Sequence, residues 1–255
     1  MLLKDKVGLI TGAGDGIGRA TAITFAKDGA KVGVADINLE GAKETVAMIN
    51  ELGGEAIAIE CDVSQESAVE AMVKSVVDAY GRLDCACNNA AGGGVFRTLQ
   101  ETKEKHWDHC HSITLKGVFL SLKHEIPALL ENGGGSIVNI ASLSGVRGEA
   151  LQSPYSSAKG GVIALTRTAA AETAQQNIRV NAVNPGAILT RALANYIERV
   201  PGAKEHTEGV HAMRRFGTPE EIADAVAYLC SDRASFITGH SLNVDGGVMV
   251  NPHTL

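Results

Sequence analysis

The sequence Thr11-Gly12-Ala13-Gly14-Asp15-Gly16-Ile17-Gly18 decides the fold of this chain. It follows a short β-branched run, Lys6–Ile10, and precedes a segment with helical periodicity, Ile17–Asp28. Glycines between a strand and a helix permit a tight turn, and they let the backbone approach a pyrophosphate that the helix N-terminus stabilises. The spacing is T-G-x-x-x-G-x-G rather than G-x-G-x-x-G, because Ile17 stands where the last glycine of that pattern would fall. The stretch therefore predicts a nucleotide-binding turn at the start of an α/β domain.

Short β-branched runs alternate with longer helical segments along the rest of the chain. This alternation predicts crossover units, and hence a mainly parallel sheet with helices on both faces. The sequence has no linker, repeat or low-complexity tract, so we expect one domain over residues 1–255. The predicted strands are Lys6–Ile10, Lys31–Asp36, Ala56–Cys61, Leu83–Asn88, Ser136–Ile140, Arg179–Val183 and Ser241–Val244. The predicted helices include Ile17–Asp28, Leu39–Leu52, Ser67–Tyr80 and a long one within Lys103–Leu130.

Helix-end signals support these boundaries. Thr218-Pro219-Glu220-Glu221 offers an N-cap, a proline at the first helical position and a glutamate three residues after the cap. Ser153-Pro154 is expected to start another helix in the same way. Gly53-Gly54 is expected to end the helix that begins after Asn38.

Charge and composition exclude several function classes. The formal net charge is -6 and no basic block occurs, which argues against a nucleic-acid partner. No apolar run approaches the roughly 20 residues needed to cross a bilayer, and the charged N-terminus does not fit a signal peptide. The five cysteines lack zinc-type spacing, so we expect free thiols. We therefore predict a cytoplasmic protein without a membrane or nucleic-acid partner.

Asp36 closes the second predicted strand, about 20 residues beyond the glycines, where dinucleotide-binding domains carry an acidic residue. A carboxylate there accepts hydrogen bonds from both adenosine ribose hydroxyls and repels a 2′-phosphate. Ile37 and Asn38 provide no Arg or Lys to hold such a phosphate, and Asp15 adds a second acidic residue. The alternative is that Asp36 only caps the strand end. Its distance from the glycines favours the first interpretation, with NAD rather than NADP as the cofactor.

Tyr155 and Lys159 stand four residues apart, on one face of a predicted helix. The pKa of an unperturbed tyrosine is about 10, and a nearby lysine cation lowers it, which gives a usable acid/base near neutral pH. Such pairs also occur by chance on many helix surfaces. Ser142 adds weight, because it lies just beyond the predicted strand Ser136–Ile140, and ligands bind at strand ends in parallel sheets. We therefore predict that Ser142, Tyr155 and Lys159 are catalytic, with the serine hydroxyl orienting a carbonyl oxygen towards the tyrosine.

Together these motifs make the chain resemble the short-chain dehydrogenase/reductase family over essentially its full length. The matching pieces, in order and at the family's spacing, are Thr11–Gly18, Cys61-Asp62-Val63, Asn88-Asn89-Ala90, Asn139–Ser142, Tyr155–Lys159, Asn184-Pro185-Gly186 with Thr190, and Asp245-Gly246-Gly247. The resemblance implies a Rossmann-type, doubly wound sheet of about seven parallel strands, usually assembled as a homotetramer. It also implies an oxidoreductase that interconverts a secondary alcohol and its ketone with NAD by hydride transfer.

The resemblance implies a role for each matching position. Tyr155 would be the acid/base and Ser142 would orient the substrate, while Lys159 would lower the tyrosine pKa and hold the nicotinamide ribose. Asp62 and Val63 would contact the adenine. The residues expected to bind the cofactor are Gly12, Asp15, Gly16, Ile17, Gly18, Asp36, Ile37, Asp62, Val63, Asn89, Ala90, Tyr155, Lys159, Pro185, Gly186, Ile188 and Thr190.

Two positions depart from the family pattern. The family usually has Asn-Asn-Ala-Gly after the fourth strand, whereas this chain has Ala91 followed by three glycines, which we expect to shift the loop without losing the cofactor contact. The family also has an asparagine in the long helix, thought to kink the helix and to hold a water that connects the lysine to solvent. Thr114 stands at that position. Its hydroxyl can bond a carbonyl one turn back and free another for water, or Thr114 is an ordinary helix residue and the relay is rearranged.

Three segments, 91–98, 143–154 and 190–215, are expected to surround the substrate. They mix apolar residues with a few charged ones, and no fixed pair of basic residues marks a carboxylate or phosphate site. A secondary alcohol on a small ring or a hydrophobic skeleton fits this composition, while sugar alcohols, steroids and acyl thioesters stay open. His109 and His111 do not share a helix face, so no metal site is predicted.

Two other functions stay open at this point. One is a non-catalytic NAD-binding sensor or scaffold, which only Thr114 supports and the intact Ser142, Tyr155 and Lys159 oppose. The other is epimerisation or dehydration with tightly held NAD. Relatives with those activities commonly have longer chains with an added substrate region, for which 255 residues leave little room.

Overall fold

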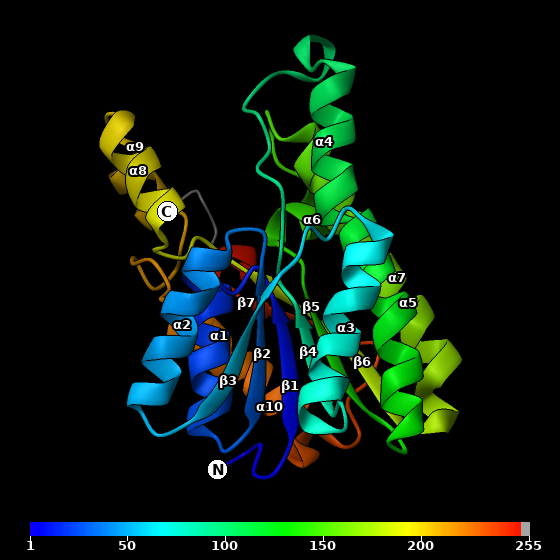
Figure 1. The fold of residues 1–255 in the computed structure, drawn as a ribbon. Helices are drawn as coiled ribbons and strands as arrows, with labels where there is room; N and C mark the ends of the chain where they lie inside the picture. The colour runs from blue at the N-terminus through cyan, green and yellow to red at the C-terminus, as the bar shows by residue number, and fades with distance from the viewer. Residues whose placement is uncertain (251–255) are drawn as a thin grey trace.

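The computed structural model describes residues 1–250, which form one seven-stranded sheet with helices on both faces (Figure 1). The strands are β1 (Val7–Thr11), β2 (Lys31–Asp36), β3 (Glu55–Glu60), β4 (Cys85–Asn88), β5 (Gly135–Ile140), β6 (Ile178–Pro185) and β7 (Ser241–Val244). Their order in the sheet is β3-β2-β1-β4-β5-β6-β7, and every neighbouring pair is parallel. The predicted doubly wound parallel fold is therefore confirmed, and its switch point, where such sheets bind ligands, lies between β1 and β4.

The helices divide between the two faces of the sheet and its carboxyl edge. They are α1 (Gly16–Lys27), α2 (Leu39–Glu51), α3 (Glu66–Tyr80), α4 (Glu104–Thr114), α5 (Lys116–Glu131), α6 (Leu143–Arg147), α7 (Ser153–Thr173), α8 (Arg191–Arg199), α9 (Ala203–Gly209) and α10 (Pro219–Cys230). Figure 1 shows α1, α2 and α10 on one face and α3, α5 and α7 on the other. In the same view α4 and the α8–α9 pair project beyond the carboxyl edge, on opposite sides.

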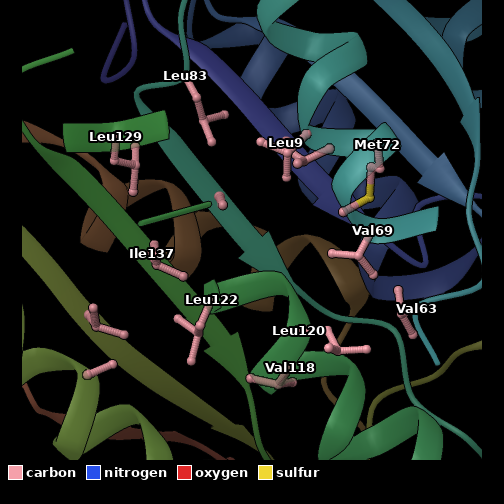
Figure 2. Packing of buried hydrophobic residues seen from close by; sticks show 14 of the residues in the cluster. Leu9, Val63, Val69, Met72, Leu83, Val118, Leu120, Leu122, Leu129 and Ile137 are labelled. Atoms are coloured by element: carbon pink, nitrogen blue, oxygen red, sulfur yellow. The ribbon is translucent and has the colours of Figure 1, made fainter. Parts of the chain in front are cut away.

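Helices cover the sheet on both faces, and the packing of its side chains holds the strands and their carboxyl ends in place. Leu9 of β1 packs towards α3 and α5, together with Met72 and Leu129 (Figure 2). The next residue, Ile10, points to the other face and packs in the core that contains Phe25 of α1. Each such side chain contributes about 1.5–3 kcal/mol when it is fully buried. The polar residues that follow the strands are thereby held on a rigid edge.

Two of the predicted helix ends are confirmed, and one is wrong in detail. Thr218 and Glu221 form the capping box: the Glu221 N–H donates to Thr218 Oγ1, and the Thr218 N–H donates to Glu221 Oε2. Gly53, with a φ of 77°, follows the end of α2 as expected. Ser153, however, is the first residue of α7 rather than its cap. Gln152 holds the cap position and makes no side-chain capping bond there.

The long helix expected within Lys103–Leu130 is two helices that meet at Leu115. Leu115 has a φ of -101° and a ψ of -53°, so the backbone bends there. The apolar periodicity runs through the bend and does not mark it, although the family resemblance places a helix-kinking asparagine at the neighbouring position, Thr114. The bend follows from long-range contacts: Thr114 bonds the loop after β4, and Leu115 packs against Gly161 of α7. As a result, α5 lies along the sheet while α4 rises past its carboxyl edge.

Two predictions made from the composition concern the cysteines and membrane-spanning segments. All five cysteines are buried free thiols, as predicted. Among residues 1–250, no helix combines the length and apolar character that a membrane crossing requires.

Candidate active site

A cleft of about 470 Å³ runs along the carboxyl edge of the sheet, across the switch point. The predicted residues that line it are Gly12, Asp15, Gly16, Ile17, Asp36, Ile37, Asp62, Val63, Asn89, Ala90, Tyr155, Lys159 and Thr190. The cleft is also lined by Cys61, Ala91 and Ile140, which lie in or beside the motifs of the family resemblance, and by Ile113 and Ala192, which the sequence did not single out. A larger cavity of about 580 Å³ lies at the amino edge, beside Lys6 and Gly135, where parallel sheets do not carry their ligand sites.

The glycine loop forms one end of the cleft and has no room for side chains. Gly12 and Gly16 have φ values of 63° and 54°, a left-handed backbone that favours glycine. A Cβ added to Gly18 would lie 2.1 Å from the Gly12 carbonyl oxygen. Arg19 stabilises the loop, because its guanidinium donates hydrogen bonds to the Gly14 carbonyl and to Thr45 Oγ1. The loop is thus a shaped cradle, open to a ligand at the N-terminus of α1.

Thr11 joins the first and fourth strands, a role that the sequence analysis missed. Its hydroxyl oxygen accepts hydrogen bonds from the backbone N–H groups of Asn89, at 3.0 Å, and Ala90, at 3.1 Å. The Asn89 amide in turn donates to the carbonyls of Thr11 and Gly12. The sequence signal was the threonine that opens the glycine motif. These bonds set the width of the cleft at the switch point.

Asp36 is held in place at the end of β2. One carboxylate oxygen accepts from the Gly14 N–H and the other from the Asn38 N–H, both at 2.8 Å. A carboxylate has about four acceptor sites, so two backbone bonds leave capacity for further donors. The side chain is half-buried and lines the cleft, where it can accept from a pair of ribose hydroxyls.

Ser142, Tyr155 and Lys159 come together at the middle of the carboxyl edge. Ser142 caps α6 by accepting from the Ser144 N–H at 3.1 Å, and its hydroxyl is close enough to the Tyr155 phenol to lower the pKa of that phenol. Lys159 is 1% exposed and its Nζ donates to the Ile140 carbonyl at 2.6 Å. That Nζ lies 5.6 Å from the centre of the Tyr155 ring. Tyr155 and Lys159 therefore line the cleft, and Ser142 lies next to Tyr155, outside the lining.

The sequence analysis predicted that the pKa of Tyr155 is lowered, and this prediction is wrong. Burial raises the pKa of Tyr155 to about 12, and the hydrogen bond from Ser142 lowers it only in part. The sequence argument assumed that the lysine cation would dominate. Burial also lowers the pKa of Lys159 to about 8, because the buried cation is itself poorly solvated. Desolvation is thus the largest influence on the pKa of both members of the pair.

Thr114 does not make the bond that the sequence suggested. Its hydroxyl accepts from the Gly92 N–H at 3.1 Å and contacts the Gly92 carbonyl oxygen at 3.4 Å, instead of bonding the carbonyl one turn back. Both residues are buried. Gly92 lies 22 positions away and belongs to the glycine run that departs from the family pattern. Thr114 therefore anchors the loop that follows β4.

Four other predicted residues lie beside the cleft rather than on its lining. Gly18 is the buried floor of the cradle, and Pro185 is the last residue of β6. Gly186 and Ile188 line a neighbouring cavity of about 360 Å³. His211 reaches into the same region, where its Nε2 accepts from the Ala187 N–H at 3.1 Å and its Nδ1 bonds the Thr207 carbonyl at 2.8 Å. This buried histidine fastens the 190–215 segment to the loop after β6.

The cleft residues fit a dinucleotide. The glycine cradle suits a pyrophosphate, and Asp36 suits the hydroxyls of a ribose. Lys159 has three N–H donors, of which the contacts within residues 1–250 use one, on Ile140, so the buried cation can donate to a second ribose. In the same part of the chain, no group of three or more His, Cys, Asp or Glu side chains is placed to hold a metal ion.

Comparisons with known proteins agree with this architecture. A family model described as enoyl-(acyl carrier protein) reductase matches residues 12–249. Cyclohexanol dehydrogenase of Acinetobacter sp. (strain SE19) is 42% identical over 242 residues, which are 95% of this chain and 94% of that protein. The crystal structure of levodione reductase superimposes with a TM-score of 0.92 at 38% identity, covering 96% of this chain and 98% of that one.

A steroid-converting enzyme is similar as well. The structure of 7α-hydroxysteroid dehydrogenase, complexed with NADH and 7-oxo glycochenodeoxycholic acid, has a TM-score of 0.90 at 37% identity and covers 96% of this chain and 94% of that one. The family model matches most of the chain, and the relatives are 37–42% identical to it over nearly their full length, so the family of this chain can be assigned. This chain belongs to the short-chain dehydrogenase/reductase family of oxidoreductases.

Proposed function

We propose that this protein is an NAD-dependent oxidoreductase that interconverts a secondary alcohol, cyclic or hydrophobic, and its ketone. The observation that carries the proposal is the placement of Tyr155 and Lys159 on the wall of a cleft that also contains the glycine loop, with Ser142 next to the tyrosine. The cyclic substrates named for cyclohexanol dehydrogenase and levodione reductase support the substrate class. The NADH in the 7α-hydroxysteroid dehydrogenase structure supports a nicotinamide cofactor.

Each residue of the trio has a defined task in this proposal. A bound nicotinamide supplies the hydride acceptor in alcohol oxidation and the hydride donor in ketone reduction. Tyr155 Oη takes the alcohol proton in oxidation and returns a proton to the carbonyl oxygen in reduction. When substrate binds, the Ser142 hydroxyl turns its single proton from the neighbouring phenol to the substrate oxygen and fixes the direction of that oxygen. Lys159 keeps a positive charge next to the phenol and stabilises the phenolate that forms during oxidation.

The raised Tyr155 pKa has a consequence for the direction of proton transfer. With a pKa of about 12, the phenol is protonated at neutral pH and is ready to donate to a ketone. Oxidation needs the phenolate, so we expect the oxidation rate to rise with pH. Ketone reduction needs the protonated form, and it should not rise in this way.

Asp36 is the basis for preferring NAD. Its carboxylate sits at the cleft wall with both oxygens already oriented by Gly14 and Asn38. A 2′-phosphate on the adenosine ribose would face this negative charge, and neither Ile37 nor Asn38 can neutralise it. A homotetramer, which the family resemblance implied, belongs to the same proposal, and size-exclusion chromatography with light scattering tests it.

A spectrophotometric assay tests the proposed activity directly. Cyclic, aromatic, steroidal and polyol alcohols are offered with NAD⁺ and NADP⁺ separately, and reduced cofactor is followed by its absorbance. We expect turnover with NAD⁺, and a loss of at least about 100-fold in Tyr155→Phe. Tyr228→Phe is the matched control, because Tyr228 lies on α10 and is 40% exposed. Cofactor binding without turnover of any alcohol or ketone would instead favour the non-catalytic sensor or scaffold.

A further inference from the structure

The segment between β6 and α10 leaves the body of the protein and is tied back to it by few contacts. It forms α8 and α9 beyond the carboxyl edge of the sheet (Figure 1). Within residues 1–250, α8 contains no buried residue and α9 contains only Ala203. Burial of apolar side chains therefore contributes little to holding these two helices in place. Their position depends on individual contacts with the loops that follow β6 and β7.

His211, two residues after α9, makes several of these contacts with one imidazole. The residue is 2% exposed. Its Nε2 accepts from the Ala187 N–H at 3.1 Å, and its Nδ1 bonds the Thr207 carbonyl at 2.8 Å. A Cβ added to Gly186 would lie 3.0 Å from Nε2, and one added to Gly246 would lie 3.3 Å from Cδ2. The imidazole thus joins α9 to the loop after β6 and to the loop after β7.

These bonds fix the charge and the tautomer of the ring. Because Nε2 of His211 accepts a hydrogen bond, it carries no proton. The single proton of the neutral ring then lies on Nδ1, which donates to the Thr207 carbonyl. A second proton on Nε2 would face the Ala187 N–H, so two donors would meet and the bond between them would be lost. The bond to Ala187 therefore exists only while the imidazole is neutral.

Within the described residues, no carboxylate bonds this imidazole to compensate for a second proton. The charged residues close to it in sequence or in the shared cavity are Glu208, Arg214, Arg215, Glu221 and Asp245. Arg215 pairs with Glu221 at 2.6 Å, and Arg214 donates to a backbone carbonyl. Both oxygens of Asp245 accept from backbone N–H groups after β7. Protonation of the ring is therefore opposed mainly by the loss of the Ala187 bond.

Ala187 connects the imidazole to the cleft. Thr190, three residues further along, lines the cleft, and its Cγ2 would lie 3.2 Å from a Cβ added to Gly16 of the glycine loop. The intervening turn is tight, because the Thr190 N–H donates to the Ile188 carbonyl at 2.7 Å. A displacement of Ala187 is consequently passed on to Thr190, and it changes the width of the cleft opposite the glycine loop.

We propose that His211 is a positioning residue whose neutral imidazole holds this wall of the cleft in the form that binds NADH, so that protonating the ring weakens NADH binding. The inference rests on the proposed function, because it requires that the cleft binds a nicotinamide dinucleotide. His211 is not part of the cleft lining and acts through Ala187 and Thr190. Bound NADH in turn favours the neutral ring, because the two equilibria are linked.

Two substitutions separate the acceptor from the proton. His211→Gln offers an amide oxygen to the Ala187 N–H and takes up no proton between pH 5 and 8, whereas His211→Leu removes the acceptor. NADH affinity is measured by fluorescence at pH 8 and at pH 5.5. At pH 8 we expect His211→Gln to bind within about 3-fold of the native protein, and His211→Leu to bind about 10-fold more weakly. Between pH 8 and pH 5.5 the native Kd should weaken about 10-fold more than that of His211→Gln.

The comparison of variants at the same pH removes the other titrations. Burial lowers the pKa of Lys159 to about 8, so Lys159 also changes charge in this range, but it does so in every variant. His240→Gln is the matched control, because His240 is exposed and lies just before β7, at the amino edge of the sheet. It should bind NADH as the native protein does at both pH values.

Three outcomes would overturn the proposal. One is an equal pH dependence in the native protein and His211→Gln. Another is native affinity in His211→Leu at pH 8, and the third is a His211→Gln affinity as weak as that of His211→Leu. If His211→Leu does not fold, the pH dependence of the native protein against His211→Gln decides alone.

Failure of the proposed function would be recognised separately, because the native protein would then not bind NADH at pH 8. Hydrogen exchange of the peptide that contains Ala187 then tests the positioning without a cofactor. Exchange at pH 5.5 that is faster in the native protein than in His211→Gln, with equal rates at pH 8, supports the role of the neutral ring. Equal rates at both pH values refute it.

Discussion

Replacing Thr114 by valine isolates one hydroxyl whose role the sequence left open. Valine has nearly the same shape, so the packing around α4 is retained while Oγ1 disappears. The Gly92 N–H then loses an acceptor at 3.1 Å in a buried place. Leaving a buried N–H without a partner costs about 1–3 kcal/mol. For a chain of this size, 1 kcal/mol lowers Tm by about 2–4 °C, so Thr114→Val should melt on the order of 2 to 12 °C below the native protein.

Thr114→Ser provides the matched comparison, because it keeps the hydroxyl and removes one methyl group. Losing a buried methyl costs about 1 kcal/mol. Thermal and urea unfolding of the three proteins should therefore rank native above Ser above Val. Activity should follow, because the loop freed at Gly92 also carries Gly94 beside Tyr155. If Thr114→Val unfolds like the native protein, or if Thr114→Ser is the less stable variant, the hydroxyl does not anchor Gly92 and Thr114 is an ordinary helix residue.

Three further changes give separate readouts. Gly18→Ala places a Cβ where only 2.1 Å is open towards the Gly12 carbonyl, and NADH fluorescence should show at least a 10-fold weaker Kd, on the order of 1.4 kcal/mol. Asp36→Asn removes the charge that opposes a 2′-phosphate, so the ratio of kcat/KM for NAD⁺ to that for NADP⁺ should fall by about 10-fold. Burial raises the pKa of Glu125 from 4.5 to about 7, so the folded state binds the extra proton. The contribution of Glu125 to the free energy of unfolding is then fully present below about pH 4.5, and about 3 kcal/mol of it is lost as the pH rises to about 7. Urea unfolding should find this pH dependence in the native protein and not in Glu125→Gln.

Much of the cofactor side of the site was predictable because its signals are local. Gly12, Gly16 and Asp36 stand at the ends of β-branched runs, and the parallel fold brings such ends to one edge whatever the details of packing. The lining of the cleft accordingly contains most of the residues named in advance. Thr11 was named as part of the glycine motif, but its own role was missed. Its hydroxyl bonds backbone N–H groups that lie 78 and 79 residues away in the sequence.

Apart from the one-residue error at the start of α7, the errors concern quantities that depend on distant neighbours. The bend at Leu115 and the Thr114–Gly92 bond join segments that no helical period connects. The direction of the Tyr155 pKa shift required knowing how deeply α7 and the loop after β5 bury the phenol. Sequence spacing places Lys159 on the same helix face, but it does not report that the buried cation is turned to the Ile140 carbonyl. An argument from charge alone, which left out the cost of burying the phenol, therefore gave the wrong direction for the pKa shift.

The proposed catalytic groups and the exposed aromatic pair are held in different ways. Lys159 is buried and bonded to the end of β5, and Ser142 caps a helix that starts after the same strand, so both depend on the rigid sheet. Phe96 and Tyr196, by contrast, are exposed and touch each other across two loops. Large-to-small changes in the exposed pair remove contact area without opening a core, whereas, in the proposed reaction, changes in the trio remove the proton transfer itself.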